Sequence, residues 1–299
     1  MKLISILKFI FFHPLNKNNR LFSVIKFIIW QLFNKVYKSK VIIPWVDDTK
    51  LIVSKGEAGV TGNLYCGLME YQDMGFILHF IRSSDLFFDI GANLGVYSVL
   101  ASGVKGCKSF AFEPIPKTFQ KLVEQIKINR LEELVHCINK GISNKNDFLE
   151  FTTEFDCMNR VVKNIKNNSV ETINAEVIKL DDYHKVDSPT IVKIDVEGYE
   201  KFVFDGGKSF FSSPNVLAII VETNGSGNLY GINDTDLHKQ ILSFGLFPII
   251  YDIFSRKIIK SNSFNKDANT VYVRDLKEAQ NRCKDSKEVR IHTANNFLL

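Results

Sequence analysis

An apolar run passes directly into a glycine-rich turn at Leu86-Phe-Phe-Asp-Ile-Gly-Ala-Asn-Leu-Gly95. A short apolar run of this kind is typical of a strand that is buried on both faces, and helical spacing follows from Leu94 to Ser102. Glycines are needed where the backbone turns tightly and comes close to a ligand, because a Cβ atom would clash there. The stretch therefore predicts a strand, a ligand-binding turn and a helix in succession.

The same alternation of short apolar strands and amphipathic helices continues along the chain. We expect strands at 109–112, 135–138, 190–194 and 216–221, helices at 118–129, from about 198 and at 234–244, a hairpin near 148–153, and closing strands at 247–251, 257–259 and 270–273. Buried strands that are each followed by a helix predict a Rossmann-like α/β fold with a mainly parallel, doubly wound sheet and an antiparallel closing strand. Ligands bind such sheets beyond the carboxyl ends of the strands, at the point where the strand order reverses.

Two details of the turn restrict the class of ligand that it can bind. Its spacing is G-x-N-x-G and not the G-x-G-x-x-G of dinucleotide sites, and no G-K-[ST] phosphate loop is present. Asp89 stands at the strand end beside the turn, where it would repel a pyrophosphate. S-adenosylmethionine carries an ammonium and a sulfonium but no phosphate, so the acid fits this cofactor.

Acids also follow the later strands. Glu113 ends the strand in Phe-Glu-Pro114, 24 positions after Asp89, where Rossmann-type folds place an acid that accepts ribose hydroxyls. Its alternative role is that of an acid interacting with a helix dipole. Lys193-Ile-Asp-Val-Glu-Gly-Tyr-Glu200 leaves the strand at 190–194, and Glu222 ends the one after it. These acids either face the ligand cleft or form a solvated cap on the following helix.

The four motifs, in this order, resemble the FkbM family of methyltransferases over about residues 81–250. The resemblance implies a class I methyltransferase fold in which Asp89, Gly91, Asn93, Gly95 and Glu113 hold S-adenosylmethionine, and a hydroxyl acceptor, often on a sugar or a secondary metabolite. Gly62-Asn-Leu-Tyr-Cys-Gly-Leu-Met-Glu-Tyr71 and His13-Pro-Leu-Asn16 are similar to a longer bacterial subgroup of the family.

Methyl transfer to a sugar hydroxyl needs a base, because the hydroxyl has a very high pKa. The candidates are Asp195 and Glu197, with Glu222 third and Lys193 as an orienting group; alternatively, Asp195 binds the methionine ammonium. Nothing in the spacing demands a metal ion. A nicotinamide oxidoreductase on a related fold and a non-catalytic, membrane-associated binding module are the competing functions.

Positive charge is concentrated at the N-terminus. Residues 1–40 carry eight Lys and Arg side chains, the first acid is Asp47, and the remainder holds 30 bases against 33 acids, so nucleic acid is not an expected partner. The apolar stretches 3–12 and 21–33 are interrupted by lysine and are too short to span a bilayer, and no signal-peptide cleavage site follows the first. They predict either helices packed on the catalytic domain or on a second subunit, or attachment to an anionic membrane surface.

The sequence thus divides into four parts: a helical extension at 1–40, a lead-in region at 41–80 with strands at 41–44 and 50–54 and a helix at 70–82, the methyltransferase domain at 81–275, and a charged tail at 276–299. We expect the tail to form a solvated helix or a frayed end. The five cysteines, Cys66, Cys107, Cys137, Cys157 and Cys283, are odd in number and scattered, which is typical of a reducing compartment. The expected location is the cytoplasm, including the inner face of the membrane.

Overall fold

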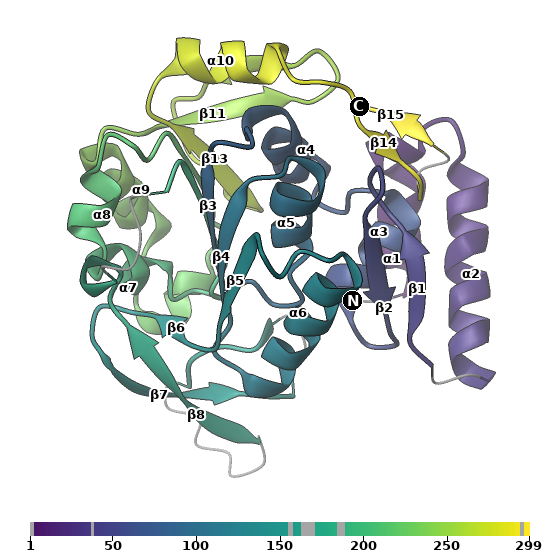
Figure 1. The fold of residues 1–299 in the computed structure, drawn as a ribbon, viewed down its shortest axis with the longest axis horizontal. Helices are drawn as coiled ribbons and strands as arrows, with labels where there is room; N and C mark the ends of the chain where they lie inside the picture. The colour runs from purple at the N-terminus through teal and green to yellow at the C-terminus, as the bar shows by residue number, and fades with distance from the viewer. Residues whose placement is uncertain (1–2, 37–38, 155–157, 163–170, 184–188, 294–295) are drawn as a thin grey trace.

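The centre of the molecule is an eight-stranded sheet with the order β12-β11-β13-β10-β9-β3-β4-β5 (Figure 1). The computed structural model describes residues 3–36, 39–154, 158–162, 171–183, 189–293 and 296–299, so Cys157 and the basic residues Lys2 and Lys38 lie outside it. The strands are β3 (Leu86–Ile90), β4 (Lys108–Phe112), β5 (Val135–Ile138), β9 (Ile191–Ile194), β10 (Ala218–Glu222), β11 (Phe247–Asp252), β12 (Lys257–Lys260) and β13 (Asn269–Val273).

Strands β5, β4, β3, β9 and β10 are mutually parallel, and β13 pairs antiparallel with both β10 and β11. The mainly parallel Rossmann-like sheet and its antiparallel closing strand are therefore confirmed. The chain runs from β3 outward to β5 and then returns to the other side of β3 with β9, so the strand order reverses between β3 and β9. The carboxyl ends of these two strands frame the expected ligand crevice.

Apolar side chains of the central strands are buried on both faces. Phe87, Ala111 and Ile191 belong to one hydrophobic cluster, while their neighbours Phe88 and Val192 belong to another. The first cluster packs against α4 (Tyr71–Phe80), the short α5 (Val96–Ser98), a π-helical turn (Val99–Val104), α6 (Pro116–Ile128) and α10 (Leu276–Lys284). The second packs against α7 (Glu200–Asp205), α8 (Lys208–Ser212) and α9 (Asp234–Ser243). This burial explains why most positions of the central strands are apolar.

Smaller elements surround the sheet. The expected hairpin near 148–153 is part of a three-stranded sheet, in which β7 (Asp147–Thr152) pairs with β8 (Thr172–Ile178) and β8 with β6 (Gly141–Ile142). The expected strands of the lead-in region are β1 (Val41–Pro44) and β2 (Lys50–Val53), followed by a helix that the sequence did not predict, α3 (Ala58–Cys66). Short 3₁₀ turns lie at Pro14–Asn16, Leu180–Asp182 and Ser226–Tyr230.

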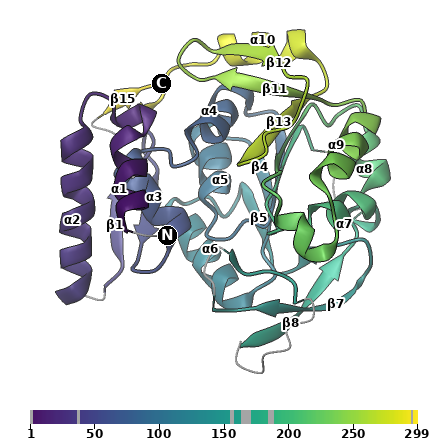
Figure 2. The same cartoon turned by 180° about the vertical axis from the view of Figure 1, so that it is seen from behind.

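The N-terminal extension consists of α1 (Leu3–Phe12) and α2 (Arg20–Val36). In both views α2 forms the outer edge of the molecule, remote from the central sheet (Figures 1 and 2). Phe27 is buried against Tyr65 of α3, with their ring centroids 5.3 Å apart, and Ile10 and Trp30 are also buried. Within the described residues, no helix has both the length and the apolar character that crossing a membrane requires.

The charged tail matches its expectation only in part, because it contains a helix but also further ordered structure. It begins with α10 but then continues into a hairpin of β14 (Arg290–Ile291) and β15 (Phe297–Leu298). Ile291 is fully buried and bridges to Val46. The expectation of a frayed end was wrong, because charge along a sequence does not reveal partners that are distant in the chain.

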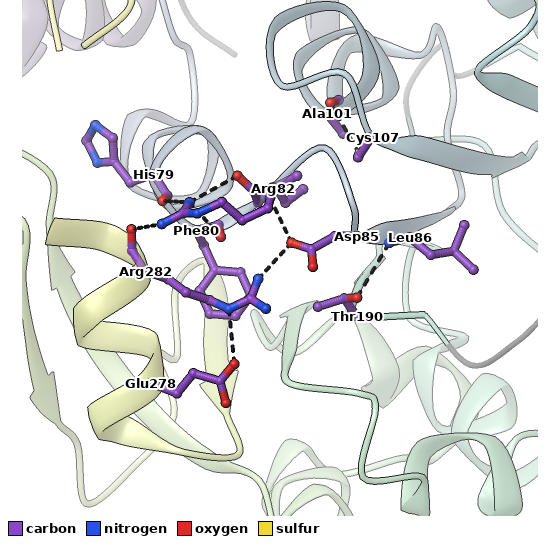
Figure 3. A network of polar contacts seen from close by, with 11 residues as sticks. His79, Phe80, Arg82, Asp85, Leu86, Ala101, Cys107, Thr190, Glu278 and Arg282 are labelled. Atoms are coloured by element: carbon purple, nitrogen blue, oxygen red, sulfur yellow. Dashed lines mark hydrogen bonds and ion pairs between the residues drawn. The ribbon is translucent and has the colours of Figure 1, made fainter. Parts of the chain in front are cut away.

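The partners of α10 are shown in Figure 3. The Arg282 guanidinium donates to the Asp85 carboxylate at 2.7 Å and lies over the Phe80 ring, and Arg82 donates to the Arg282 carbonyl. The tail is thereby fixed to the residues that immediately precede β3. One hydrophobic cluster contains residues from all four parts of the proposed domain division, which stays a prediction.

Candidate active site

A cavity of about 220 Å³ opens at the carboxyl edge of the sheet, where the strand order reverses. Strands β3, β9 and β10 and the segment that follows β4 all contribute to its lining. Of the nine predicted site residues, the lining contains Asp89, Gly91, Asn93, Glu113, Lys193, Asp195, Glu197 and Glu222. Only Gly95 lies outside the lining; it caps the start of α5 with a φ of 77°.

The turn after β3 has the left-handed backbone that its glycines predict. Gly91 has a φ of 78°, and a Cβ atom there would lie 1.8 Å from the backbone carbonyl oxygen of Asp195. The backbone N–H groups of Gly91 and Ala92 donate to the Phe112 carbonyl, which fixes the turn against the end of β4. Gly91 is thus required by contact between two loops of the protein, and not only by a ligand, as the sequence argument assumed.

Asp89 and Glu113 are almost completely buried beside this turn. The Ser98 hydroxyl donates to Asp89 at 2.7 Å, and burial raises the pKa of Asp89 to about 6. Glu113 accepts the N–H of Asn93 at 3.0 Å and that of Ile115 at 2.9 Å, one on each carboxyl oxygen. Burial raises the pKa of Glu113 to about 8. Each oxygen of Glu113 keeps acceptor capacity for a ligand hydroxyl, since a carboxylate has about four lone-pair sites.

Lys193 supplies a buried positive charge on the floor of the site. Its ammonium donates to Asp195 at 2.7 Å and lies 4.6 Å from the centroid of the Tyr97 ring. Burial alone would lower the pKa of Lys193, but the carboxylates of Asp195, Glu70 and Asp89 raise it above its ordinary value. Lys193 is therefore a fixed cation that orients Asp195, and it cannot act as a base.

The acids at the ends of β9 and β10 differ in the hydrogen bonds that their carboxyl groups accept. Glu222 accepts hydrogen bonds from Asn224 at 2.7 Å and from Ser226 at 3.3 Å. No hydrogen bond reaches the Glu197 carboxyl from the part of the chain that the structure describes, and its backbone has an unusual φ of 55°. Burial, together with Asp195 and Glu222, raises the pKa of Glu197 to about 8, and burial raises that of Glu222 to about 7.

Glu200 supports the loop that presents Glu197. It is buried, and one of its carboxyl oxygens accepts the backbone N–H groups of Val196 and Gly198 at 3.1 and 3.2 Å. Gly198 in turn has a φ of 97°, and a Cβ atom on it would lie 2.6 Å from the Ser226 carbonyl oxygen. Burial raises the pKa of Glu200 to about 8. This acid holds the loop and does not line the cavity.

Several lining residues were not predicted from the sequence, and two of them contact each other. The Tyr97 hydroxyl donates to Glu70 at 2.7 Å, and both side chains line the cavity from elements outside the four motifs. Glu70 lies within the quoted segment Gly62–Tyr71, but no periodicity places that segment over the sheet edge. Tyr97 is surrounded in the sequence by apolar residues of a predicted helix, a pattern that predicts an aromatic side chain in the core. Met69, Met74, Phe151 and Arg160 of the lining were also not predicted.

The electrostatics of the cavity restrict its ligands. Six carboxyl groups line it, from Glu70, Asp89, Glu113, Asp195, Glu197 and Glu222, against the two cations Lys193 and Arg160. Such a lining favours a cationic ligand with hydroxyl groups, disfavours a diphosphate, and offers several groups that can accept a proton. Among the described residues, no three or more His, Cys, Asp or Glu side chains are grouped so as to hold a metal ion.

The chain is similar in sequence to known methyltransferases. The family model described as the methyltransferase FkbM domain matches residues 89–245. The hexuronic acid methyltransferase AglP of Haloferax volcanii is 28% identical over 174 residues, which make up 58% of this chain and 67% of AglP. Among solved structures, the methyltransferase FkbM of Methylobacillus flagellatus aligns with a TM-score of 0.43 and 18% identity over 68% of this chain and 50% of that chain. The alignment thus spans half the length of the Methylobacillus protein.

A precorrin-6y C5,15-methyltransferase of Geobacter metallireducens aligns with a TM-score of 0.39 and 13% identity, over 69% of this chain and 88% of that one.

The family model begins at Asp89 in β3 and ends after α9, so it covers all four strand ends that line the cavity. It also covers more than half of the chain. The chain therefore belongs to the FkbM methyltransferase domain family and is a methyltransferase.

Proposed function

We propose that the protein is an S-adenosylmethionine-dependent O-methyltransferase that methylates a hydroxyl of a saccharide, glycolipid or related small molecule. The observation that carries this proposal is the acidic cavity at the reversal point of the sheet, with a base candidate and a buried cation on its acceptor side. Family membership supports the reaction type.

The residues of the first two strand ends fit the cofactor. Glu113 would accept the ribose hydroxyls, and the carboxylates of Asp89 and Asp195 would face the positively charged methionine portion. Asn93 and Gly91 would shape the turn around the nucleoside, with Gly95 supporting the turn from outside the lining. When bound, S-adenosylmethionine supplies a methyl group that is activated by its sulfonium leaving group.

We propose Glu197 as the general base. A base must have a free lone pair directed at the acceptor and a pKa near the working pH. Asp195 accepts a hydrogen bond from Lys193, and Glu222 accepts hydrogen bonds from Asn224 and Ser226. The carboxyl of Glu197, by contrast, accepts no hydrogen bond from the described residues. Glu197 is also presented by a strained, left-handed backbone that Glu200 and Gly198 hold in place, as is common at functional sites. Asp195 and Glu222 then act as neighbours that keep the Glu197 pKa high.

A saccharide acceptor is supported by the relative AglP, which is a hexuronic acid methyltransferase. A sugar hydroxyl ionises only when a base removes its proton as the methyl group arrives. The residues of this chain would align the hydroxyl and take up that proton, and in-line alignment supplies most of the remaining acceleration. We also propose that the enzyme works in the cytoplasm, with residues 1–40 at the inner face of the membrane, and that nucleic acid is not its acceptor.

The decisive experiment is incubation of the full chain with radiolabelled S-adenosylmethionine and fractionated glycan and glycolipid extracts, followed by mass spectrometry of the labelled product. A methyl ether on a sugar hydroxyl is the expected product. Calorimetry with S-adenosylhomocysteine and with NAD provides an independent measurement. Binding of NAD without binding of S-adenosylhomocysteine would favour a nicotinamide oxidoreductase and overturn the proposal.

A further inference from the structure

The outer surface of α1 and α2 exposes more apolar side chains than any other part of the described chain. Ten of the nineteen large exposed apolar side chains in the described residues belong to these two helices: Leu3, Ile4, Phe9, Phe12, Leu21, Phe22, Ile25, Ile28, Ile29 and Leu32. We call these ten residues the outer apolar face. Exposed apolar side chains gathered on two adjoining helices mark a site that another molecule covers.

The outer apolar face is distinct from the side of α2 that packs on the protein. Phe27 and Trp30 are buried on that inner side, whereas Ile25, Ile29 and Leu32 are 48 to 59% exposed. Between Leu21 and Leu32 the exposed positions are all apolar except Gln31. The helix is therefore already docked on the protein, and its second apolar side is exposed from Leu21 to Leu32, at the edge of the molecule (Figure 2).

Charge identifies the kind of partner. Residues 1–46 contain no Asp or Glu, and Lys8, Lys17, Arg20 and Lys35, which lie on or between α1 and α2, have exposed side chains. Arg20 places its guanidinium 5.8 Å from the ring centroid of Phe12, a member of the outer apolar face, so the cation and the apolar side chains are presented together. Helices that combine apolar side chains with lysine and arginine, and lack acids, bind at the interface of anionic bilayers.

A second copy of this chain fits the surface less well. A symmetric dimer through the outer apolar face would bring the same basic side chains of two copies together, and no acid is available within residues 1–46 to neutralise them. Anionic lipid headgroups supply the missing negative charge, and acyl chains cover the apolar residues. We propose that the outer apolar face of α1 and α2 lies in the interface of an anionic membrane and holds the catalytic cavity beside a lipid surface.

The test is flotation of the full chain with vesicles of phosphatidylcholine containing about 30% phosphatidylglycerol, and with vesicles of phosphatidylcholine alone. We expect binding to the anionic vesicles that weakens as salt rises, because added ions screen the lysines. Replacing Ile25 and Ile29 together by glutamine (I25Q/I29Q) should lower the bound fraction about tenfold. The matched control is I250Q/I259Q, which removes two isoleucines of similar exposure from β11 and β12 and should leave binding unchanged.

Charge is tested with the pair K8Q/K35Q, which should also weaken binding to anionic vesicles, while K239Q/K266Q on other exposed lysines should not. Failure of the wild-type chain to float with anionic vesicles overturns the proposal. So does a dimer in analytical ultracentrifugation that I25Q/I29Q converts to a monomer, since the face is then a contact between copies. Equal binding to neutral vesicles, insensitive to K8Q/K35Q, overturns the preference for anionic lipid. None of these measurements depends on methyl transfer. The membrane proposal can therefore fail while the enzymatic proposal stands, and the enzymatic proposal can fail while the membrane proposal stands.

Discussion

At the carboxyl edge of the central sheet six carboxyl groups line one cavity, and Asp89 and Glu113 among them are buried. On the outer face of α2, isoleucine and leucine side chains are exposed to solvent. Buried carboxyl groups without cationic partners raise the free energy of the folded state, and exposed apolar residues gain nothing from folding. Folding alone favours neither arrangement. Each region becomes favourable only when a second molecule supplies what it lacks, a cation at the sheet edge and an apolar, anionic surface at α2.

The largest effect is expected from the base at the sheet edge. Glu197→Gln should lower kcat by about 10²- to 10⁴-fold, because the acceptor proton loses its destination while the shape of the side chain is kept. Single-turnover methylation measures this loss, and calorimetry should show cofactor affinity within about twofold of wild type. The exposed Glu132→Gln serves as the control. Full activity in Glu197→Gln would transfer the role to Glu222 or Asp195.

Cofactor binding at the other half of the edge should respond next. Glu113→Ala should weaken S-adenosylhomocysteine binding by about 10- to 100-fold, since two acceptor oxygens for the ribose are lost. Calorimetry measures this, and Glu133→Ala, at an exposed position just before β5, is the matched control. A thermal scan checks that the turn at Asn93, which Glu113 also holds, remains folded. Unchanged affinity in a folded Glu113→Ala protein would contradict the ribose assignment.

The raised pKa values predict the pH dependence. Burial and neighbouring carboxylates raise the pKa of Glu197 to about 8 and that of Glu222 to about 7. A protonated carboxyl cannot accept the hydroxyl proton, so kcat/KM should fall about tenfold per pH unit below the controlling pKa and level off above about 8. A pH profile of initial rates tests the sign. The residual activity of Glu197→Gln should no longer rise with pH in this range. A wild-type rate that decreases as the pH is raised from about 6 to 8 would exclude a carboxylate base.

The smallest effect should come from the exposed side of α2. Ile29→Gln should change the free energy of unfolding by no more than about 0.5 kcal/mol, because the side chain is already in water. On the opposite side of the same helix, Phe27→Ala should cost about 3–5 kcal/mol through loss of its contact with Tyr65. Chemical denaturation measures both. A large loss of stability in Ile29→Gln would mean that this face is covered within the protein.

The sequence predicted the sheet because its strands carry their signal locally. Phe87 and Phe88 point to opposite clusters, and both must be apolar, so a parallel strand buried on both faces can be read from a few residues. Five of the six lining acids were predicted for the same reason, since parallel strands end at one edge and Asp89, Glu113 and Glu222 stand at those ends. The nearness of Lys193 and Asp195 also followed from their spacing within one strand end.

What was missed depends on contacts between distant segments. Glu70 lies immediately before α4, a helix that precedes the core strands, and its hydrogen bond with Tyr97 holds it at the cavity. The tail is held by an ion pair between Arg282 and Asp85, which lies almost 200 residues earlier in the chain. Charge patterns along a segment predict exposure unless a partner is known, and partners are set by the fold. Such residues could not be placed by any local rule.

The close contact between Gly91 and Asp195 has a practical consequence for engineering. With only 1.8 Å available for a Cβ atom, the backbones of the two loops touch directly and leave no adjustable side chain between them. A change to residues 195–198 intended to admit a new acceptor will shift the turn at Gly91 as well. Selection for altered acceptor preference should therefore include the turn residues from the start, because the two halves of the cavity must be remodelled together.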